Sequence, residues 1–385
     1  MNPPFDSNKL NVLMEEAGVD LVLATSKHNV QYLLGGYHFF IFDHMNAIGI
    51  SRYLPAVGIP RGRLDGAFYI GNPMEAWQQE DEPLWVGDVR NASWTSRSTA
   101  QEAAESMRRL GLSAGTIAVE EAFLPMDAFG ALQEELPQAK WVEALPLLEE
   151  LRIIKAPEEL ALLKEASEGV VDAMQAAMKS AKAGMTTREI SERMYQEEAN
   201  RGLSFEYALV CTGRSYVRAP SEARWEKGNI LSIDSGGTKR GYMGDLCRMA
   251  VMGNATPLLR DLLGEVQAVQ AAARSAVRAG IPGGQVFEAA LAELAKCPHH
   301  DDMGFMAHGI GLVSHEAPHL TGTGMIPYPG THEKRPLETG MVLSIETELK
   351  SSEVGFVNLE DTVVVTGEGF EALGDDARAW TEVEG

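Results

Sequence analysis

The sequence predicts an α+β protein of two domains, and three observations lead to this prediction. The chain has 385 residues, which is long for one compact core, and 45% of them are apolar, so each of two domains can bury a core. In the first third, short apolar runs alternate with helical patterns, whereas longer apolar runs carrying single acidic residues follow later. We therefore expect a smaller α/β domain over residues 1–150 and a larger α+β domain over residues 151–385.

The first domain is predicted to be a mixed sheet covered by helices. Helical patterns occur at residues 7–17, 99–110 and 126–136. Strand-like apolar runs occur at residues 20–24, 48–51, 66–70, 84–86 and 116–119. Because helices and strands alternate along this part of the chain, we expect the helices to cover the sheet.

A proline marks the start of the second domain. In Ala156-Pro157-Glu158-Glu159 it takes the first helical position and acidic residues follow in the first turn, as is typical of a helix N-terminus. Helices are expected at residues 157–183, 188–201, 257–279 and 286–296. Strands are expected at residues 208–211, 229–234, 245–252, 341–348 and 355–366. This order predicts one curved antiparallel sheet with helices on its outside.

Composition excludes several classes of partner. The net charge of −22 argues against binding to a nucleic-acid backbone and is more simply read as a contribution to solubility. The three cysteines form no close pair, which favours a reducing compartment. We find no leader segment and no apolar run of eighteen residues. We therefore expect a cytoplasmic protein that binds neither nucleic acid nor membrane.

Two aspartates are predicted to meet on neighbouring strands. Asp234 ends an apolar strand before Gly236-Gly237, and Asp245 opens the next strand eleven positions later. The short connection 238–242 predicts a hairpin, which would place the two carboxylates side by side. Asp234 can also be read as the cap of a turn. If the carboxylates are adjacent, however, they repel, and one retains its proton unless a cation lies between them.

Two glutamates strengthen the prediction of a cation site. Glu346 and Glu360 each lie in an otherwise apolar strand, where an unpaired carboxylate is costly to bury. The sequence offers no obvious buried Arg or Lys to pair with these acids, so a metal ion is the expected partner. Oxygen ligands joined by one imidazole favour Mn, Fe, Co or Zn over Cu.

The imidazole is predicted to come from His308. A lone histidine is more often structural, but His308 opens a His-Gly-Ile-Gly segment, and His315 follows seven positions later. Glycines at such positions admit a close approach of the backbone. We therefore expect this segment to line the site.

The complete set resembles a known family. It comprises Asp234, Asp245, the segment from His308 through His315 to Pro318, Glu346, and Glu360-Asp361 before a valine-rich strand. This pattern is similar to the pita-bread family, which includes methionine aminopeptidase, aminopeptidase P, prolidase and creatinase. The N-terminal part resembles the creatinase/prolidase branch through Gly18–Leu21, Tyr32–Gly35 and the connector Arg152–Glu159. The resemblance covers nearly the whole chain and implies a pita-bread domain preceded by a creatinase-type domain.

The resemblance also implies two divalent metal ions, of Mn, Co, Zn or Fe type, in a homodimer. In the family pattern, Asp234 binds one metal, His308 and Glu346 bind the other, and Asp245 and Glu360 bridge both. A water that bridges the metals becomes hydroxide near neutral pH and attacks a carbonyl carbon.

Two further residues acquire roles by the same resemblance, and a third, His319, lies near the motif. Glu346 would shuttle the proton of the attacking water. His315 would donate a hydrogen bond to the substrate or to the oxyanion. His319 would line the substrate pocket.

Four departures from the family pattern concern the substrate. The loop 213–220 lacks the usual histidine, and Asn358 replaces an arginine two positions before the last ligand. Glu346-Thr347-Glu348 replaces the common Glu-Pro-Gly, and Cys247 stands where threonine is common. The loop instead carries two cations, Arg214 and Arg218. They are either solvated or one of them grips a substrate carboxylate by a two-pronged contact.

Three functions remain open at this point. The first is hydrolysis of a small peptide by an Xaa-Pro dipeptidase or aminopeptidase. The second is hydrolysis or lyase chemistry on a small non-peptide metabolite. The third is a catalytically silent binding protein, which is disfavoured because all five metal ligands are present.

Overall fold

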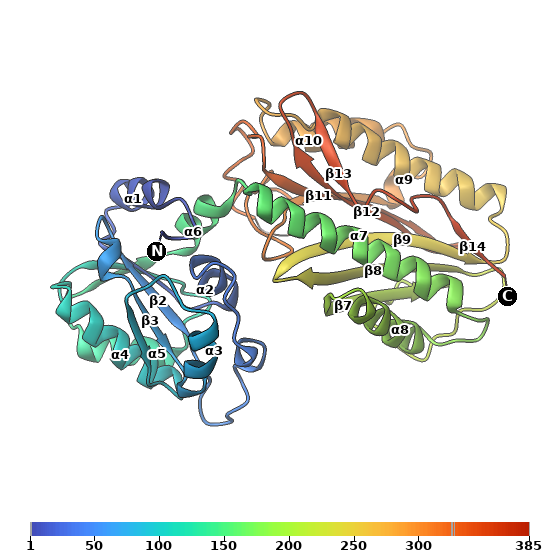
Figure 1. Ribbon diagram of the computed structural model, residues 1–385. Coiled ribbons are helices and arrows are strands. Elements are labelled where there is room, and N and C mark those ends of the chain that lie inside the picture. The colour runs from blue at the N-terminus through green and yellow to red at the C-terminus, as the bar shows by residue number, and fades with distance from the viewer. Residues whose placement is uncertain (1, 325, 327, 385) are drawn as a thin grey trace. The chain divides into compact units, whose positions relative to one another are not determined.

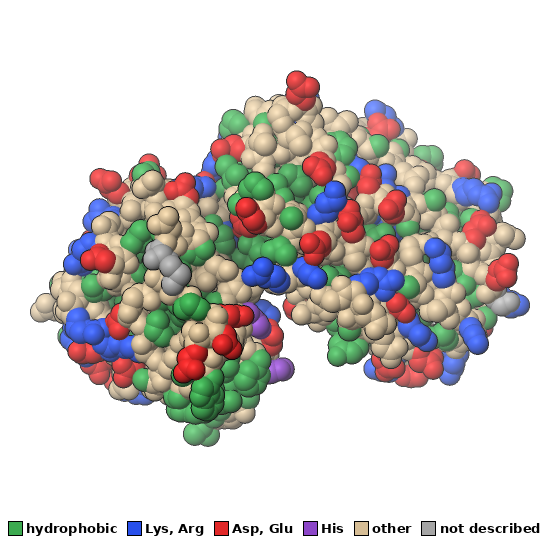
Figure 2. All heavy atoms as spheres, in the orientation of Figure 1, with side chains coloured by type: hydrophobic (Ala, Val, Ile, Leu, Met, Phe, Trp, Pro, Cys, Tyr) green, Lys and Arg blue, Asp and Glu red, His purple; other side chains and the backbone are tan. Residues whose placement is uncertain are grey.

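The computed structural model describes residues 2–324, 326 and 328–384, and it forms two compact units that divide between Arg152 and Ile153 (Figure 1). Acidic and basic side chains are interspersed over the visible face of each unit (Figure 2). No helix in the described residues combines the length and the apolar character that crossing a bilayer requires.

The N-terminal unit is built on a six-stranded mixed sheet in the order β4-β3-β2-β1-β5-β6. Its strands are β1 (Leu21–Ala24), β2 (Ala56–Pro60), β3 (Phe68–Gly71), β4 (Asp88–Asn91), β5 (Thr116–Val119) and β6 (Lys140–Glu143). Its helices are α1 (Ser7–Glu16), α2 (Lys27–Leu33), α3 (Ala76–Asp81), α4 (Ser96–Arg109), α5 (Met126–Glu135) and α6 (Leu145–Arg152), with short 3-10 helices η1 (Phe40–His44), η2 (Leu64–Gly66) and η3 (Pro73–Glu75). The central strand β1 runs antiparallel to β2 and parallel to β5, which confirms the predicted mixed sheet.

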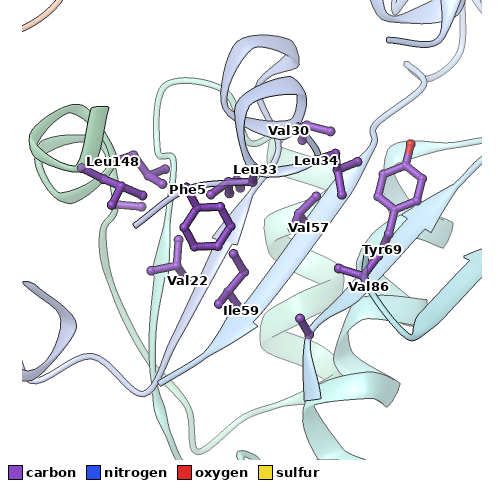
Figure 3. Packing of buried hydrophobic residues seen from close by; sticks show 14 of the residues in the cluster. Phe5, Val22, Val30, Leu33, Leu34, Val57, Ile59, Tyr69, Val86 and Leu148 are labelled. Carbon is purple, nitrogen blue, oxygen red and sulfur yellow. The ribbon is translucent and has the colours of Figure 1, made fainter. Parts of the chain in front are cut away.

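Two apolar clusters cover the two faces of this sheet. One joins Phe5, Val22, Val57 and Ile59 to residues of α2 and α6 (Figure 3). The other packs α4 and α5 against the opposite face, around Phe68. The sheet is thus buried between helices, as the alternating pattern predicts.

Two of the predicted strands in this unit are wrong. Residues 48–51 form turns, and the side chain of Ile50 is 96% exposed. Residues 84–86 have no strand partner, although Val86 is buried in the first cluster. A run of three or four apolar residues does not distinguish a strand from a loop that packs on the core.

The C-terminal unit contains the predicted curved antiparallel sheet, in the order β10-β11-β12-β9-β8-β7. Its strands are β7 (Ser204–Thr212), β8 (Ile230–Lys239), β9 (Tyr242–Met252), β10 (Met303–Gly309), β11 (Val342–Ser351), β12 (Gly355–Val365), β13 (Phe370–Leu373) and β14 (Thr381–Val383). Its helices are α7 (Pro157–Ser180), α8 (Thr187–Asn200), α9 (Pro257–Ala276) and α10 (Gly284–Leu294), with the 3-10 helix η4 (His300–Asp302). The added strand β14 pairs with β9 in parallel, and β10 was not predicted from the sequence.

Helices cover the face of this sheet that lies opposite the predicted metal ligands. Alternate residues of a strand point to opposite faces. The residues that directly adjoin the ligands contact the helices: Ser235 bonds Glu198 of α8, Gly244 lies against Ala166 of α7, and Asp361 pairs with Arg274 of α9. A Cβ at Gly244 would lie 2.6 Å from the Ala166 carbonyl carbon, so glycine allows α7 to approach the strand. The ligand residues therefore face away from the helices.

A tight hairpin between β8 and β9 sets the register of the two aspartates. Its two-residue turn, Arg240–Gly241, has φ values of 50° and 86°, as expected for a turn that follows the twist of the strands. Asp234 lies opposite Cys247, and Asp245 lies opposite Gly236. The predicted hairpin is confirmed, but the aspartates are diagonal neighbours on one face rather than directly opposite each other.

Glu198 leads to a prediction about pH and stability. Its side chain is buried behind β8, where Ser235 Oγ donates to Oε1 at 2.9 Å and Oε2 has no hydrogen-bond partner among the described residues. Burial, assisted by the charge of Glu206, raises the pKa of Glu198 to about 8 from 4.5. The folded protein therefore holds a proton that the unfolded chain releases, and stability falls as pH rises from about 4.5 to about 8.

We expect Glu198→Gln to flatten this decline and to stabilise the protein above pH 8. Urea unfolding at several pH values measures the effect. Glu192→Gln, on the exposed face of the same helix, is the matched control and should behave as wild type. A pH profile of Glu198→Gln that parallels wild type would contradict the burial of a protonated carboxyl.

Candidate metal centre

Five adjacent strands each contribute one predicted ligand. All five side chains are buried: Asp234 on β8, Asp245 on β9, His308 on β10, Glu346 on β11 and Glu360 on β12. The strand register places Glu346 opposite Glu360, Glu360 opposite Cys247, and Cys247 opposite Asp234. Cys247 thus lies between the carboxylates of Glu360 and Asp234 in this row, and its thiol lies 3.5 Å from Ser232 Oγ.

The ligand atoms converge in two groups, within each of which they lie no more than 4.8 Å apart. One group contains Asp245, His308 and Glu360, and the other contains Asp234, Glu346 and Glu360. Glu360 belongs to both groups, as suits a bridging ligand. Glu346 is grouped with Asp234 here, whereas the family pattern assigns it to the same metal as His308. The assignment of ligands to particular metals stays a prediction.

The donor atoms fit a divalent cation. Asp234 Oδ1 and His308 Nε2 are buried, yet neither has a hydrogen-bond partner among the described residues. Buried polar atoms are nearly always paired, so two unpaired atoms, one in each group, indicate a missing partner. Several carboxylate oxygens with one imidazole are the donors that Mn, Fe, Co and Zn accept.

The electrostatics of the site also favour a bound cation. Burial raises the pKa values of Asp234 and Asp245 well above the usual range, and the negative charge of Glu360 raises them further. Burial and the same charge raise the pKa of Glu346 to about 7. Burial opposes the charge of Glu360 as well, but its contact with His308, at 3.7 Å, lowers its pKa. These three carboxyl groups therefore keep their protons to a higher pH than free carboxyl groups do, unless a positive charge lies nearby.

Hydrogen bonds orient the acids. Ser344 Oγ donates to Glu360 Oε1 at 2.6 Å, and Asn358 Nδ2 donates to Glu346 Oε1 at 2.8 Å. The Tyr207 hydroxyl donates to Asp245 Oδ1. Groups that hold the ligands in this way fix their geometry and tune their basicity. Ser344 and Asn358 could be found from strand alternation, whereas nothing in the sequence pattern singled out Tyr207.

The two loop arginines have different positions. Arg214 is exposed, and its Nε donates to the Glu353 carbonyl at 2.7 Å. Arg218 reaches into the site, where Nη2 contacts Asp234 Oδ2 and lies 4.0 Å from Glu346 Oε1. The expectation that the acids have no basic partner is therefore wrong for Asp234. The loop places the guanidinium at the site although it lies 16 positions before Asp234 in sequence.

His315 lies beside the ligand set. Its ring stacks on that of His308 with centroids 3.9 Å apart, and its Nδ1 shares a hydrogen bond with the Tyr328 hydroxyl. Burial, together with the neighbouring His308, lowers the pKa of His315 to about 4, so the ring is neutral at physiological pH. The ring of His319 stacks on that of Tyr328 with centroids 5.4 Å apart, so His319 and His315 both pack against Tyr328. Tyr328 was not predicted, because the loop that carries it has no periodic pattern.

The glycines of the His308 segment permit a close crossing of chains. A Cβ on Gly309 would lie closer to the backbone of Ala317 and Glu316 than real Cβ atoms approach, and one on Gly311 would collide with the Glu316 carboxylate. Glu316 in turn accepts from Lys155 Nζ at 2.9 Å in a buried ion pair. The predicted reason for these glycines, close approach of the backbone, is confirmed.

This crossing predicts that Gly309→Ala destabilises the protein by about 1–3 kcal/mol through overpacking and displaces His308. Thermal unfolding measures the stability. Gly264→Ala is the control, because Gly264 is an exposed helical residue with no atom near its missing Cβ. That variant should be neutral or stabilising by up to about 1 kcal/mol. If both variants melt as wild type does, the crossing does not constrain residue 309.

Comparisons with known proteins agree with this architecture. Residues 7–154 match the model of the creatinase/prolidase N-terminal domain, and residues 161–367 match that of metallopeptidase family M24. An Xaa-Pro dipeptidase of Pyrococcus horikoshii is 22% identical over 377 residues, which cover 95% of each chain.

Solved structures show the same fold. The structure of an Xaa-Pro dipeptidase from Bacillus anthracis superposes with a TM-score of 0.81, at 23% identity and 98% coverage of each chain. The prolidase from Thermococcus sibiricus gives a TM-score of 0.82 at 21% identity, covering 100% of this chain and 99% of that one. The family model spans more than half of the 385 residues. The chain therefore belongs to metallopeptidase family M24, with a creatinase-type N-terminal domain preceding its pita-bread domain.

Proposed function

We propose that the chain is a metal-dependent peptidase that hydrolyses small peptides of the Xaa-Pro type. The convergence of four buried carboxylates and one imidazole on one face of the sheet carries this proposal. Family membership supports hydrolysis of peptides, and relatives named Xaa-Pro dipeptidase support the substrate class.

The five ligands would hold two divalent ions of the Mn, Co, Zn or Fe type. Glu360 lies within reach of both ligand groups. The bound ions would supply the positive charge that lets a water molecule lose its proton near neutral pH. Manganese as the metal, a homodimer and a cytoplasmic location are further predictions, which metal analysis, light scattering and cell fractionation would test.

Two side chains would assist hydrolysis. One would carry the proton of the attacking water, and the other would stabilise the negative charge that develops on the substrate carbonyl. The pKa of Glu346, raised to about 7 by burial and by Glu360, suits a group that accepts and returns a proton near neutral pH. His315 is neutral, and its Nδ1 is engaged by Tyr328. When the Tyr328 hydroxyl donates to Nδ1, Nε2 carries the hydrogen and would donate it to the substrate carbonyl as negative charge develops. His319, which also packs against Tyr328, would contact the substrate as well.

A second function deserves a test because two residues near the ligands depart from the family pattern. Arg218 lies at the ligands, and Asn358, rather than an arginine, binds Glu346. These changes fit hydrolysis or lyase chemistry on a small non-peptide metabolite. A non-catalytic binding protein would not need the complete ligand set. A panel of Xaa-Pro dipeptides, longer proline-containing peptides and small amides, assayed with Mn, Co and Zn, separates these possibilities.

We expect Glu346→Gln to lower the metal content and to slow hydrolysis by at least about 100-fold, because it removes both a ligand and a proton carrier. Elemental analysis of the purified protein and kcat on the active substrate measure the two effects. Glu348→Gln, two residues along the same strand and bonded to Lys350, is the control and should keep both. A wild-type protein that takes up no metal would contradict the proposal.

The position of Arg218 predicts a role in substrate binding. We expect Arg218→Ala to raise KM by about tenfold for substrates with a free carboxylate, because a two-pronged charged contact is lost. Esterified substrates should be affected less. Arg214→Ala tests the other predicted cation in parallel, and its bond to Glu353 predicts a smaller change. KM values for the acid substrates that are unchanged from wild type in both variants would exclude both arginines.

A further inference from the structure

The loop that carries Arg218 is fixed at several points. The Val210 N–H donates to the Arg218 carbonyl at 2.7 Å, which extends the pairing of β7. Arg214 binds the carbonyl of Glu353 in the turn between β11 and β12. In the same turn, Gly355, with φ of 112°, lies against the backbone of Gly213, where no Cβ would fit. The position of Arg218 therefore follows from the backbone and not only from its side-chain contacts.

The Arg218 guanidinium also packs on an aromatic ring. Its central carbon lies 5.1 Å from the centroid of the Phe356 ring, on the strand that carries Glu360. A guanidinium over an aromatic face is attracted to it, more so when partly removed from water, and the Arg218 side chain is only 28% exposed. A guanidinium keeps its proton throughout the physiological pH range. The site thus contains a permanent positive charge supplied by the chain.

This charge is distributed unequally between the two ligand groups. Arg218 contacts Asp234 and lies 4.0 Å from Glu346, the two acids that belong only to the second group. In the other group, the basic side chain within the described residues is the imidazole of His308, itself a predicted ligand, 3.7 Å from Glu360. A divalent ion that binds Asp234 must share this carboxylate with the guanidinium or displace it, whereas an ion at Asp245 and His308 does neither.

We propose that Arg218 is a built-in competitor for one of the two metal ions. The chain then binds its metals in two unequal steps: a tight one at Asp245, His308 and Glu360, and a weaker one at Asp234, where the ion competes with the charge of Arg218. This inference rests on the metal centre of the proposed function. Because the guanidinium is tethered beside the ligands, a second ion that takes Asp234 from it also frees the cation that is assigned to the substrate carboxylate.

Calorimetric titration of the chelated, full-length protein with Mn²⁺ tests the inference, with the bound metal counted by elemental analysis after gel filtration. Wild type should show two events whose dissociation constants differ by at least about tenfold. Arg218→Gln removes the charge and should tighten the second event by about tenfold while leaving the first unchanged. Arg214→Gln removes the same charge from the same loop, outside the contact with Asp234, and should titrate as wild type.

The remaining outcomes separate the two proposals. Two equal events in wild type, or no change of the second event in Arg218→Gln, would overturn the competition while leaving the metal centre intact. Absence of Mn²⁺ binding in all three proteins would overturn the metal centre and the competition with it. Thermal unfolding of the metal-free proteins checks that each variant is folded, and Arg218→Lys, which keeps the charge, should retain the weak second event.

Discussion

Four buried carboxylates that converge in two groups sharing Glu360 are the constraint on which the C-terminal unit depends. Burial and mutual repulsion raise the pKa values of Asp234, Asp245 and Glu346, so the folded chain alone does not stabilise their charged forms. Neighbouring residues offset part of the cost of charging these carboxyl groups. Ser344, Asn358 and Tyr207 supply hydrogen bonds, Arg218 supplies one positive charge, and the unpaired atoms of Asp234 and His308 leave positions that a metal ion can use.

The sheet separates two kinds of polar chemistry because successive side chains face opposite ways. Glu360 points to the metal ligands, while its neighbour Asp361 is buried among Arg248 and Arg274 on the helical face. Arg248 also donates to the Glu360 carbonyl at 2.8 Å, so the ion pairs behind the sheet fix the backbone of a ligand in front of it. Stability is thus contributed on one face, and the unsatisfied acids on the other face remain available for function.

Local pattern was sufficient for most of the C-terminal unit and for the convergence of the five predicted ligands on one face. Acidic residues in apolar strands are visible in the sequence, and alternation determines which of them share a face. It was insufficient where tertiary contact overrides pattern: β10 was missed because its strand character depends on pairing with β11, and residues 84–86 are buried without joining a sheet. Tyr207 and Tyr328 were not predicted at the site, because their positions follow from the register of β7 and from the folding of a loop. For Arg218 the sequence left two alternatives open, a solvated cation and a substrate-binding one. Likewise, the net charge of the chain does not predict that the side chain of a loop arginine will contact Asp234.

Anomalous diffraction from crystals soaked in Zn²⁺ tests the central claim most directly. The account predicts a strong peak within about 2.0–2.2 Å of ligand atoms of Asp245, His308 and Glu360, where the zinc would satisfy the unpaired imidazole nitrogen. A map with no peak among the five ligand residues, and with the carboxyls instead paired to one another or to water, would contradict it.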